Sequence, residues 1–360
     1  MSKIYSVFTG TGSYVPTKQI KNEYFHTYEF YDTTGKKLPN PNEEITDKFE
    51  EITTIAERRY AEDNEATSDL ALIASRRAIE AAGIDKEDLD YIIFAHNFGE
   101  TRVDNIAIDV VPTLAARLKN KLGIKNPNAV AYDVLYGCPG WIQAVIQADY
   151  FIRSGDAKKI LVVGGDVLSR ISDPHDRDSM IYADGAGAAI MEGRESDTPV
   201  GVIGHNSRTD ALDYAYMLRM GPSYNAELAA KNDLYLKMNG RKLYMYALSN
   251  VPKTIKAGLD KLNLHITDVE KILIHQANGK MDDAILSRLF KLYEIEEVPE
   301  TIMPMTISWL GNSSVATVPT LLDLLTRNEL DEHSVKSNDN IVLASVGAGM
   351  SINSVIYRIP

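Results

Sequence analysis

The sequence predicts an α/β protein. Short runs rich in valine, isoleucine and tyrosine alternate with longer segments whose apolar residues recur at helical spacing. Strands that alternate with helices of this length are typical of layered domains in which helices cover the faces of a sheet. The chain has 360 residues, which is enough for two domains or for one large core in two parts.

The predicted elements follow one another in a regular order. The expected strands are Ile4–Thr9, Tyr91–Ala95, Val130–Val134, Ile160–Gly164, Gly187–Met191, Val200–His205, Lys271–Ile274, Ile341–Ser345 and Ser351–Arg358. The expected helices are Thr67–Ala82, Ile106–Leu122, Trp141–Arg153, Leu243–Leu262, Met281–Leu289 and Val315–Thr326. The segment Tyr31–Asp47 is rich in proline, asparagine, glycine and charge, and we expect a surface loop there.

The order of elements repeats along the chain. Each half runs through a strand, a long helix, a strand, a turn into another helix and a closing pair of strands. The repetition lies in the order of elements and not in residue identity. The first half ends near Glu192, and GRESDTPV is expected to be a short polar link. We therefore expect two pseudo-symmetric halves, residues 1–192 and 193–360.

Composition and charge limit the classes of function. A formal net charge of −12 gives little support for nonspecific nucleic-acid binding, although cations are dense in ARLKNKLGIK and GRKLY. Those two stretches are either solvated helix faces or docking sites for an acidic partner. No apolar run approaches the roughly 20 residues of a membrane helix, and the N-terminal residues resemble a first strand more than a signal peptide. A single cysteine forbids an internal disulfide, so we expect a cytoplasmic protein without membrane insertion.

The one cysteine, Cys138, lies where a β-favouring run ends and a helical pattern begins. Pro139 suits the first helical position, and Gly155 suits a C-terminal stop. A thiol at the start of a helix faces unpaired amide N–H groups and the positive end of the helix dipole, which both favour the nucleophilic thiolate. From position alone, a buried inert cysteine remains the alternative.

Two further polar residues occupy similar places in the pattern. His275 follows an apolar strand, and Asn312 precedes a helix. Taken separately, His275 can be an ordinary hydrogen-bonding group and Asn312 a helix N-cap. Taken with Cys138, they form a set in which every member falls at a strand-to-helix turn. A neutral histidine and an asparagine amide can direct two N–H donors at one developing oxyanion, and a cysteine suits acyl transfer through a thioester.

The glycine-rich segments do not predict a nucleotide-binding fold. DGAGAAI and SVGAGMS lack the G-x-G-x-x-G spacing and the strand–turn–helix setting of a dinucleotide site. They are typical of tight turns, and the second is able to present a backbone N–H to a substrate. The seven histidines are scattered and one cysteine cannot form a thiolate metal site, so no metal is expected.

Six longer motifs occur in a recognisable order: GCPGWIQAVIQADYFIRSG, VVGGDVLSRISDPHDRD, YADGAGAAI, HQAN, LGNSSVATVP and GAGMS. In this order they resemble β-ketoacyl-acyl-carrier-protein synthase III, a condensing enzyme of the thiolase superfamily, over nearly the whole chain. The resemblance implies a five-layer αβαβα fold of two pseudo-symmetric halves, assembled as a homodimer. It also implies an acyltransferase that needs neither an organic cofactor nor a metal.

The reaction implied by the resemblance is a decarboxylative Claisen condensation. The cysteine accepts an acyl group from a thioester, commonly acyl-CoA, and a malonyl thioester on acyl carrier protein then loses CO2 and attacks the acyl-enzyme to give a 3-oxoacyl product. By this resemblance Cys138 is the nucleophile, while His275 and Asn312 hold the malonyl thioester oxygen. The backbone N–H groups of Cys138 and Ala348 form a second oxyanion hole, and Lys280 lies near the carrier-protein entrance.

The sequence departs from the family pattern in two places. A W-x-x-x-R-T-G-I stretch usually grips CoA, but here Lys48 and Ile52 stand at the Trp and Arg positions and Thr54 at the Gly, which leaves open whether CoA or carrier protein delivers the acyl group. Asn97 lies roughly where related hydroxymethylglutaryl-CoA synthases have a catalytic Glu, which argues against that activity. Glu100 is a catalytic candidate because some long-chain relatives use a Glu from this loop across the dimer; a solvated carboxylate is the alternative.

Four possible functions of the protein are compared. The leading hypothesis is condensation that starts fatty-acid synthesis or related acyl-chain building, and the alternative is a 3-oxoacyl synthase of a specialised pathway primed from a carrier protein. A cysteine hydrolase that uses Cys138 and His275 is disfavoured because HQANGK resembles an oxyanion-hole turn. A non-catalytic partner subunit is disfavoured because such subunits generally lose the nucleophile, which this chain retains.

Overall fold

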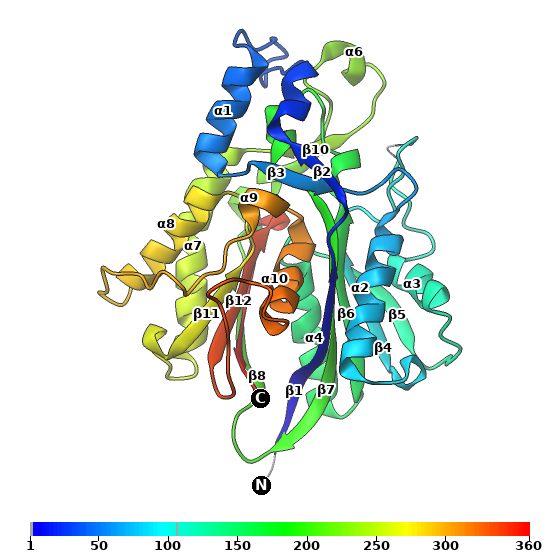
Figure 1. The fold of residues 1–360 in the computed structure, drawn as a ribbon, viewed down its shortest axis with the longest axis vertical. Coiled ribbons are helices and arrows are strands. Elements are labelled where there is room, and N and C mark those ends of the chain that lie inside the picture. Colours follow the sequence, from blue (N-terminus) through cyan, green and yellow to red (C-terminus); the bar gives the residue numbers. More distant parts are fainter. Residues whose placement is uncertain (1–2, 106) are drawn as a thin grey trace.

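Two mixed sheets form the frame of the molecule, and the computed structural model describes them within residues 3–105 and 107–360 (Figure 1). The larger sheet has the order β1-β7-β6-β4-β5 and the smaller sheet the order β11-β12-β13-β8. The strands of the larger sheet are β1 (Lys3–Tyr14), β4 (Tyr91–His96), β5 (Val130–Leu135), β6 (Lys159–Val167) and β7 (Asp184–Ser196). Those of the smaller sheet are β8 (Gly201–Thr209), β11 (Val269–Ile274), β12 (Asn340–Gly347) and β13 (Ser351–Arg358).

The two sheets repeat one pairing pattern. In the larger sheet β4 runs parallel to β6, and the pairs β6–β7 and β7–β1 are antiparallel. In the smaller sheet β11 runs parallel to β12, and the pairs β12–β13 and β13–β8 are antiparallel. The expected pseudo-symmetry is therefore confirmed, with β5 added parallel to β4 in the larger sheet only.

The expected polar link after the first half is partly wrong. Strand β7 continues past Glu192 to Ser196, because its pairing with β1 extends to Lys3. A boundary at residue 192 would fall inside this strand. The division into residues 1–192 and 193–360 stays a prediction.

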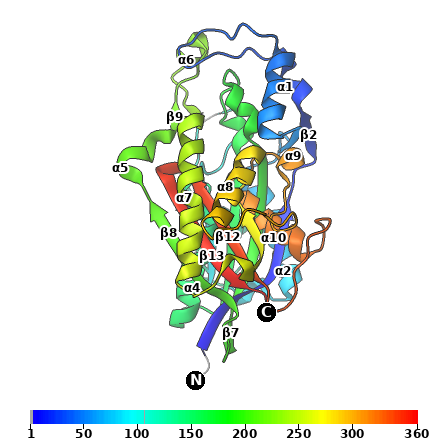
Figure 2. The same ribbon diagram turned by 90° about the vertical axis from the view of Figure 1, so that its left-hand side faces the viewer.

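Helices complete five layers around the two sheets (Figures 1 and 2). The helices α2 (Thr67–Ala82) and α3 (Leu114–Leu122) cover the outer face of the larger sheet. The helices α4 (Gly140–Ser154) and α10 (Thr317–Thr326) lie between the sheets, and α7 (Gly240–Asp260) and α8 (Gly279–Lys291) cover the outer face of the smaller one. The expected αβαβα layering is confirmed.

The middle layer is apolar around most of its circumference because both sheets pack on it. Trp141, Val145 and Ile152 of α4 are buried in one cluster with Leu321 of α10 and Leu343 of β12. This packing fixes the start of α4, where Cys138 lies, between the two sheets.

Smaller elements gather mainly at the end of the molecule that is uppermost in Figure 1. They include helix α1 (Asn42–Thr53), the short helices α5 (Ala211–Tyr214), α6 (Ala226–Ala229) and α9 (Ile307–Leu310), and the hairpins β2–β3 (Lys18–Lys21, Glu57–Tyr60) and β9–β10 (Leu218–Gly221, Tyr235–Met238). Short 3-10 helices span Asn22–Thr27, Lys86–Asp88, Leu168–Arg170, Arg177–Ile181, Ala215–Met217, Ile266–Asp268, Ser314–Ala316 and Ala348–Met350. Within the described part of the chain, no helix has both the length and the hydrophobicity that crossing a membrane requires.

Two predicted elements differ from the structure. The expected loop Tyr31–Asp47 becomes helical at Asn42, where α1 begins, because Ile45 and Phe49 fall on one face that packs against the hydrophobic core. The expected helix Ile106–Leu122 begins only at Leu114, since the Thr113 hydroxyl accepts the Ala116 N–H and caps the helix there. Residue 106 lies outside the described residues.

Candidate active site

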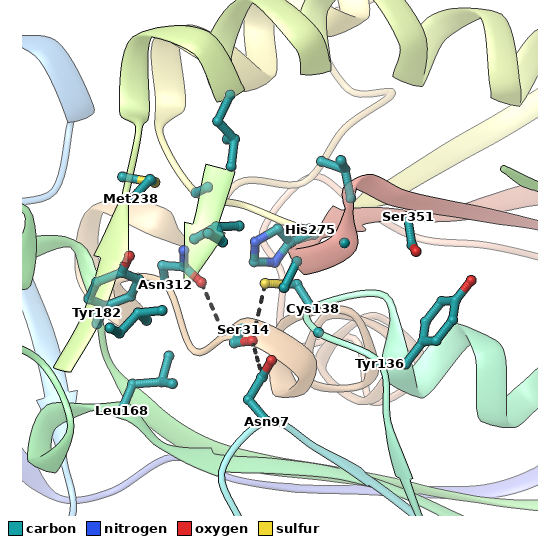
Figure 3. Close-up of a pocket in the computed structure, with 18 of the residues that line it drawn as sticks. Asn97, Tyr136, Cys138, Leu168, Tyr182, Met238, His275, Asn312, Ser314 and Ser351 are labelled. Carbon is teal, nitrogen blue, oxygen red and sulfur yellow. Dashed lines mark hydrogen bonds between the residues drawn. The ribbon is translucent and has the colours of Figure 1, made fainter. Parts of the chain in front are cut away.

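The sequence-predicted residues meet in one cavity of about 450 Å³, which we call the chamber (Figure 3). Cys138 follows β5, His275 follows β11 and Ala348 follows β12, and all three line the chamber with Asn312. The carboxyl ends of parallel strands meet at one edge of a sheet, which is where ligands bind in open α/β folds. Because β5 belongs to the larger sheet and β11 and β12 to the smaller one, the packing of the two sheets brings together residues that are far apart in the sequence.

Two glycines allow the turns that carry Cys138 and Ala348 to pack against each other. Gly137 has a φ of 73°, and a Cβ there would lie 2.8 Å from the Ala348 backbone N. A Cβ on Gly347 would lie 2.6 Å from the Cys138 backbone N. Any side chain at either position would separate the two backbone amides that the family resemblance assigns to an oxyanion hole.

The thiol of Cys138 is less acidic than its position at the start of α4 predicts. Pro139 is the N-cap and the helix begins at Gly140, so the sulfur does lie beside the helix N-terminus. Burial nevertheless raises the pKa of Cys138 to about 11, and a hydrogen bond from Ser314 acts in the opposite direction. Burial thus opposes the effect that the helix N-terminus is expected to have on the thiol, and the role of Cys138 as the nucleophile stays a prediction.

His275 is a neutral hydrogen-bonding group at this site. Its side chain is 4% exposed, and burial lowers its pKa to about 4. Its Nδ1 has no hydrogen-bond partner among the described residues. A neutral imidazole in this position can donate one N–H to a ligand without carrying a charge.

Asn312 has its amide oriented by the next turn of the chain. Its Oδ1 accepts the Ser314 backbone N–H at 2.8 Å (Figure 3), and the backbone N–H of Asn312 donates to the Ile181 carbonyl oxygen at 3.0 Å. With Oδ1 used in this way, the two Nδ2 hydrogens remain as donors at the chamber wall. The expected N-cap role is thus replaced by a turn in which Asn312 anchors the following 3-10 helix.

The rest of the chamber is largely apolar. The β9–β10 hairpin supplies one wall, and residues of β5, β12, α7, α8, the 3-10 helix Leu168–Arg170 and the loop after β4 supply the others. The apolar lining residues are Phe98, Leu135, Leu168, Leu218, Met220, Leu236, Met238, Leu243, Met281 and Val346. Such a lining suits an aliphatic acyl chain, and its flexible methionines can adapt to different shapes.

A second cavity of about 880 Å³, which we call the channel, continues from the chamber. The two share Met238, Leu243, Ala277, Met281 and Asn312. A ligand in the channel can therefore extend to the Asn312 amide.

The walls of the channel carry charged side chains. Lys48 of α1 lines it with Arg177 and Arg241, and these three cations are exposed. Asp178 lines it as well, and burial raises the pKa of that carboxyl to about 6. The combination suits a long substrate that bears phosphate groups.

One family accounts for both halves of the chain. The model of 3-oxoacyl-[acyl-carrier-protein] synthase III matches residues 132–211, and the model of its C-terminal part matches residues 259–359. Together the two segments cover half of the sequence. The chain belongs to the 3-oxoacyl-[acyl-carrier-protein] synthase III family. It is an acyltransferase of this type, as the motifs predict.

Solved structures of the family have the same fold over their whole length. β-Ketoacyl-[acyl carrier protein] synthase III from Thermus thermophilus is 27% identical with a TM-score of 0.80, and the match covers 98% of this chain and 99% of that one. The Aquifex aeolicus VF5 3-oxoacyl-[acyl-carrier-protein] synthase III is 26% identical with a TM-score of 0.77, covering 99% and 100%. The priming β-ketosynthase of the R1128 polyketide pathway is 26% identical with a TM-score of 0.80, covering 99% and 96%.

Lys280 and Glu100 lie outside the chamber lining. Lys280 is exposed in the first turn of α8, beside Asn278 and Met281 of the channel wall. Glu100 is only 8% exposed, and its carboxylate accepts the Ser68 hydroxyl at 2.6 Å and the Ser68 backbone N–H at 2.9 Å. The alternative of a solvated carboxylate is therefore wrong, and Glu100 is tied to the start of α2 within its own chain.

Sequence reasoning missed several polar residues of this synthase. Ser314 and Tyr182 line the chamber, and Asp166 lies behind it at the end of β6. Asn97 was noted only for the activity that it argues against. Asp166 and Ser314 do belong to two of the motifs that resemble the family, VVGGDVLSRISDPHDRD and LGNSSVATVP. Only the fold, however, shows that these two residues lie near Cys138. Among the described residues, no group of three or more His, Cys, Asp or Glu side chains is arranged to hold a metal.

Proposed function

We propose that this synthase uses Cys138 to take an acyl group from a thioester and then condenses it with a malonyl thioester on acyl carrier protein. The Cys138 sulfur attacks the acyl carbonyl and the thiol of the carrier leaves. The malonyl group then loses CO2, its C2 carbanion attacks the acyl-enzyme, and the sulfur leaves to give the 3-oxoacyl product. The observation that supports this proposal is the meeting of Cys138, His275 and Asn312 in a chamber that opens into a charged channel.

The division of roles follows from charge. Loss of CO2 places negative charge on the malonyl thioester oxygen, and a neutral His275 with the Asn312 amide can stabilise that oxygen through two N–H donors. Because burial lowers the His275 pKa to about 4, the side chain is a neutral imidazole at neutral pH. It is therefore not an acidic imidazolium, which would protonate and so quench the carbanion. We assign the second oxyanion hole, for the acyl carbonyl, to the backbone N–H groups of Cys138 and Ala348. Removing one such donor typically lowers kcat about 10²–10³-fold.

The channel fits the carrier arm of the substrate. Its cations Lys48, Arg177 and Arg241 are able to bind phosphate groups, which both CoA and the prosthetic arm of acyl carrier protein possess. We assign Lys280, near the channel wall, to the docking of acyl carrier protein. No resident cofactor has a role in this scheme.

We further propose a cytoplasmic homodimer. The loop after β4 exposes apolar side chains at Val103, Ile108, Val110 and Val111, as a surface covered by a second copy would. Glu100 lies in this same loop and would therefore be near the dimer contact. Its hydrogen bonds to Ser68 nevertheless hold its carboxylate inside its own chain.

A second candidate is priming of a specialised pathway. The structural likeness to the R1128 priming β-ketosynthase is as high as that to the Thermus enzyme, with a TM-score of 0.80 for each. The two candidates share one chemistry and differ in the acyl group and the product's fate.

Product analysis tests the proposed reaction. The enzyme is mixed with an acyl thioester, on CoA or on acyl carrier protein, with and without malonyl-acyl carrier protein, and the products are identified by mass spectrometry. We expect a 3-oxoacyl-carrier product and one CO2 per product only when malonyl-acyl carrier protein is present. Release of free acid in its absence as the sole reaction would instead establish a cysteine hydrolase.

A further inference from the structure

A chain of hydrogen bonds leads from the buried Asp166 through Asn97 and Ser314 to the sulfur of Cys138, and Figure 3 shows its part from Asn97 to Cys138. The Ser314 hydroxyl donates to Cys138 Sγ at 3.2 Å, and Asn97 Nδ2 donates to the Ser314 hydroxyl at 2.8 Å. Asn97 Nδ2 also donates to Asp166 Oδ2, and the Asn97 backbone N–H donates to Asp166 Oδ1 at 2.8 Å. These contacts connect the ends of β4 and β6 with the turn after Asn312.

The number of hydrogens on each group fixes the direction of these bonds. An ionised carboxylate only accepts, so Asp166 orients the Asn97 amide with Nδ2 toward itself and toward Ser314. The reverse orientation would place the amide oxygen against the carboxylate. The Ser314 hydroxyl has one hydrogen, and because it accepts from Asn97, that hydrogen is free to be directed at the sulfur.

The backbone holds Ser314 in an unusual conformation. Its φ is 53°, in the left-handed region that residues other than glycine adopt at a cost. The bond from its N–H to Asn312 Oδ1 helps to maintain this conformation. Strain of this kind persists where the surrounding structure enforces it, and functional sites are common among such places.

The sulfur needs a hydrogen-bond donor in this environment. Burial raises the pKa of the Cys138 thiol to about 11, and the negative charge of Asp166 acts in the same direction. In the proposed reaction the sulfur carries negative charge twice, when it attacks the acyl thioester and when it leaves the acyl-enzyme. A hydroxyl donor directed at the sulfur stabilises that charge in both steps.

We propose that Ser314 is a catalytic residue that stabilises the Cys138 thiolate through this hydrogen bond, and that Asn97 and Asp166 are positioning residues that keep the Ser314 hydroxyl directed at the sulfur. This inference rests on the proposed role of Cys138 as the nucleophile. The other titratable groups that line the chamber are His96, Tyr136, Tyr182, Arg219 and His275, and the variants below leave all of them in place.

Alkylation of the single cysteine tests the inference without any substrate. The rate of carbamidomethylation of the full-length protein by iodoacetamide is measured by intact-protein mass spectrometry between pH 6 and pH 10, and the only thiol in the chain is Cys138. We expect Ser314→Ala to shift the pH–rate profile to higher pH and to slow alkylation about tenfold at pH 8, because the thiolate loses a hydrogen bond. Ser75→Ala, which removes a buried hydroxyl on α2 that does not line the chamber, is the matched control and is expected to keep the wild-type profile.

A double-mutant cycle separates positioning from a general structural effect. Asn97→Ala should shift the profile in the same direction as Ser314→Ala, but should have no further effect in the Ser314→Ala background, because Asn97 acts through that hydroxyl. Asp166 is left unchanged in this cycle, because its charge by itself raises the pKa of Cys138, and thermal unfolding checks that each variant is folded. Equal shifts from Asn97→Ala in both backgrounds, or a wild-type profile for Ser314→Ala, would overturn the inference.

The result is independent of the reaction itself. Shifted profiles in an enzyme that makes no 3-oxoacyl product would contradict the proposed function and leave the role of Ser314 toward the thiolate standing. Unshifted profiles in an enzyme that does make the product would contradict the role of Ser314 alone.

Discussion

Gly279 leaves the space that the side chain of Thr54 fills. A Cβ atom on Gly279, the first residue of α8, would overlap the Thr54 hydroxyl and approach its methyl group to 3.1 Å. Thr54 itself ends α1 with a φ of 63°, a left-handed conformation that is costly for a β-branched residue. This pair joins α1 to α8 next to the channel, at the position where the family pattern has glycine.

Gly279→Ala should therefore disturb the channel. We expect a loss of about 1–3 kcal/mol in the free energy of unfolding from the overpacked contact, together with a higher KM for the thioester substrate because Ile52 and Thr53 line the channel. Urea unfolding and steady-state kinetics measure the two effects.

The matched control for this substitution is Gly240→Ala. Gly240 is also the first residue of a helix, but a Cβ there would meet its nearest atom, Met238 Cε, at 3.6 Å. We expect little loss of stability at that position. Adding Thr54→Gly to Gly279→Ala should restore most of the lost stability, and a double variant no more stable than the single one would contradict the account.

Acid should weaken the folded state partly through His275. Its folded pKa is lowered to about 4, so between its ordinary pKa near 6.5 and pH 4 the unfolded chain binds a proton that the folded protein does not. Stability is thus lost as the pH falls through 6.5, by about 2 kcal/mol at pH 5 relative to pH 8. Urea unfolding of wild type and His275→Asn at these two pH values isolates this effect, because other groups titrate in both proteins. An equal loss in both would show that His275 is not a buried neutral group.

The chamber wall depends on a buried ion pair. Lys237 of β10 bonds to Asp173 and Asp176, and its Nζ lies 3.3 Å from the centroid of the Tyr224 ring. Its strand neighbours Leu236 and Met238 line the chamber.

Lys237→Met should leave two buried carboxylates without their cation. We expect a loss of about 3–5 kcal/mol in the free energy of unfolding. Lys256→Met breaks an exposed pair with Asp260 on α7 and should cost less than about 1 kcal/mol. Thermal and urea unfolding compare the two, and similar losses would contradict a structural role for the Lys237 cluster.

Local sequence patterns predict the alternation of strands and helices, whereas the five-layer arrangement and the roles of the three central residues follow from the resemblance of the motifs to the family. Helical spacing and β-favouring runs are local patterns, so α2 and β13 have the predicted bounds. Cys138 and His275 lie where such patterns end, after β5 and β11, whereas Asn312 follows the short helix α9 and not a strand as predicted. Because β5 and β11 belong to different sheets, the packing of the two sheets is what brings the three residues together.

The remaining features depend on long-range contacts. The β9–β10 hairpin has short strands whose role as a chamber wall depends on the Lys237 ion pairs, and no local pattern predicts these. The pKa of Cys138 depends on how deeply the fold buries it. Helix α1 was missed although Ile45, Phe49 and Ile52 have helical spacing, because charged residues and prolines dominate that segment.

The most direct test of the central claim is acylation of Cys138. Wild type and Cys138→Ala are each mixed with acyl-CoA and acyl-carrier-protein donors from C2 to C14, without any malonyl thioester, and the intact masses are measured. We predict that wild type gains the mass of one acyl group from a defined class of donor and that Cys138→Ala gains none. An equal mass gain in Cys138→Ala, or a 3-oxoacyl product formed by that variant at the wild-type rate, would contradict the assignment of Cys138 as the nucleophile.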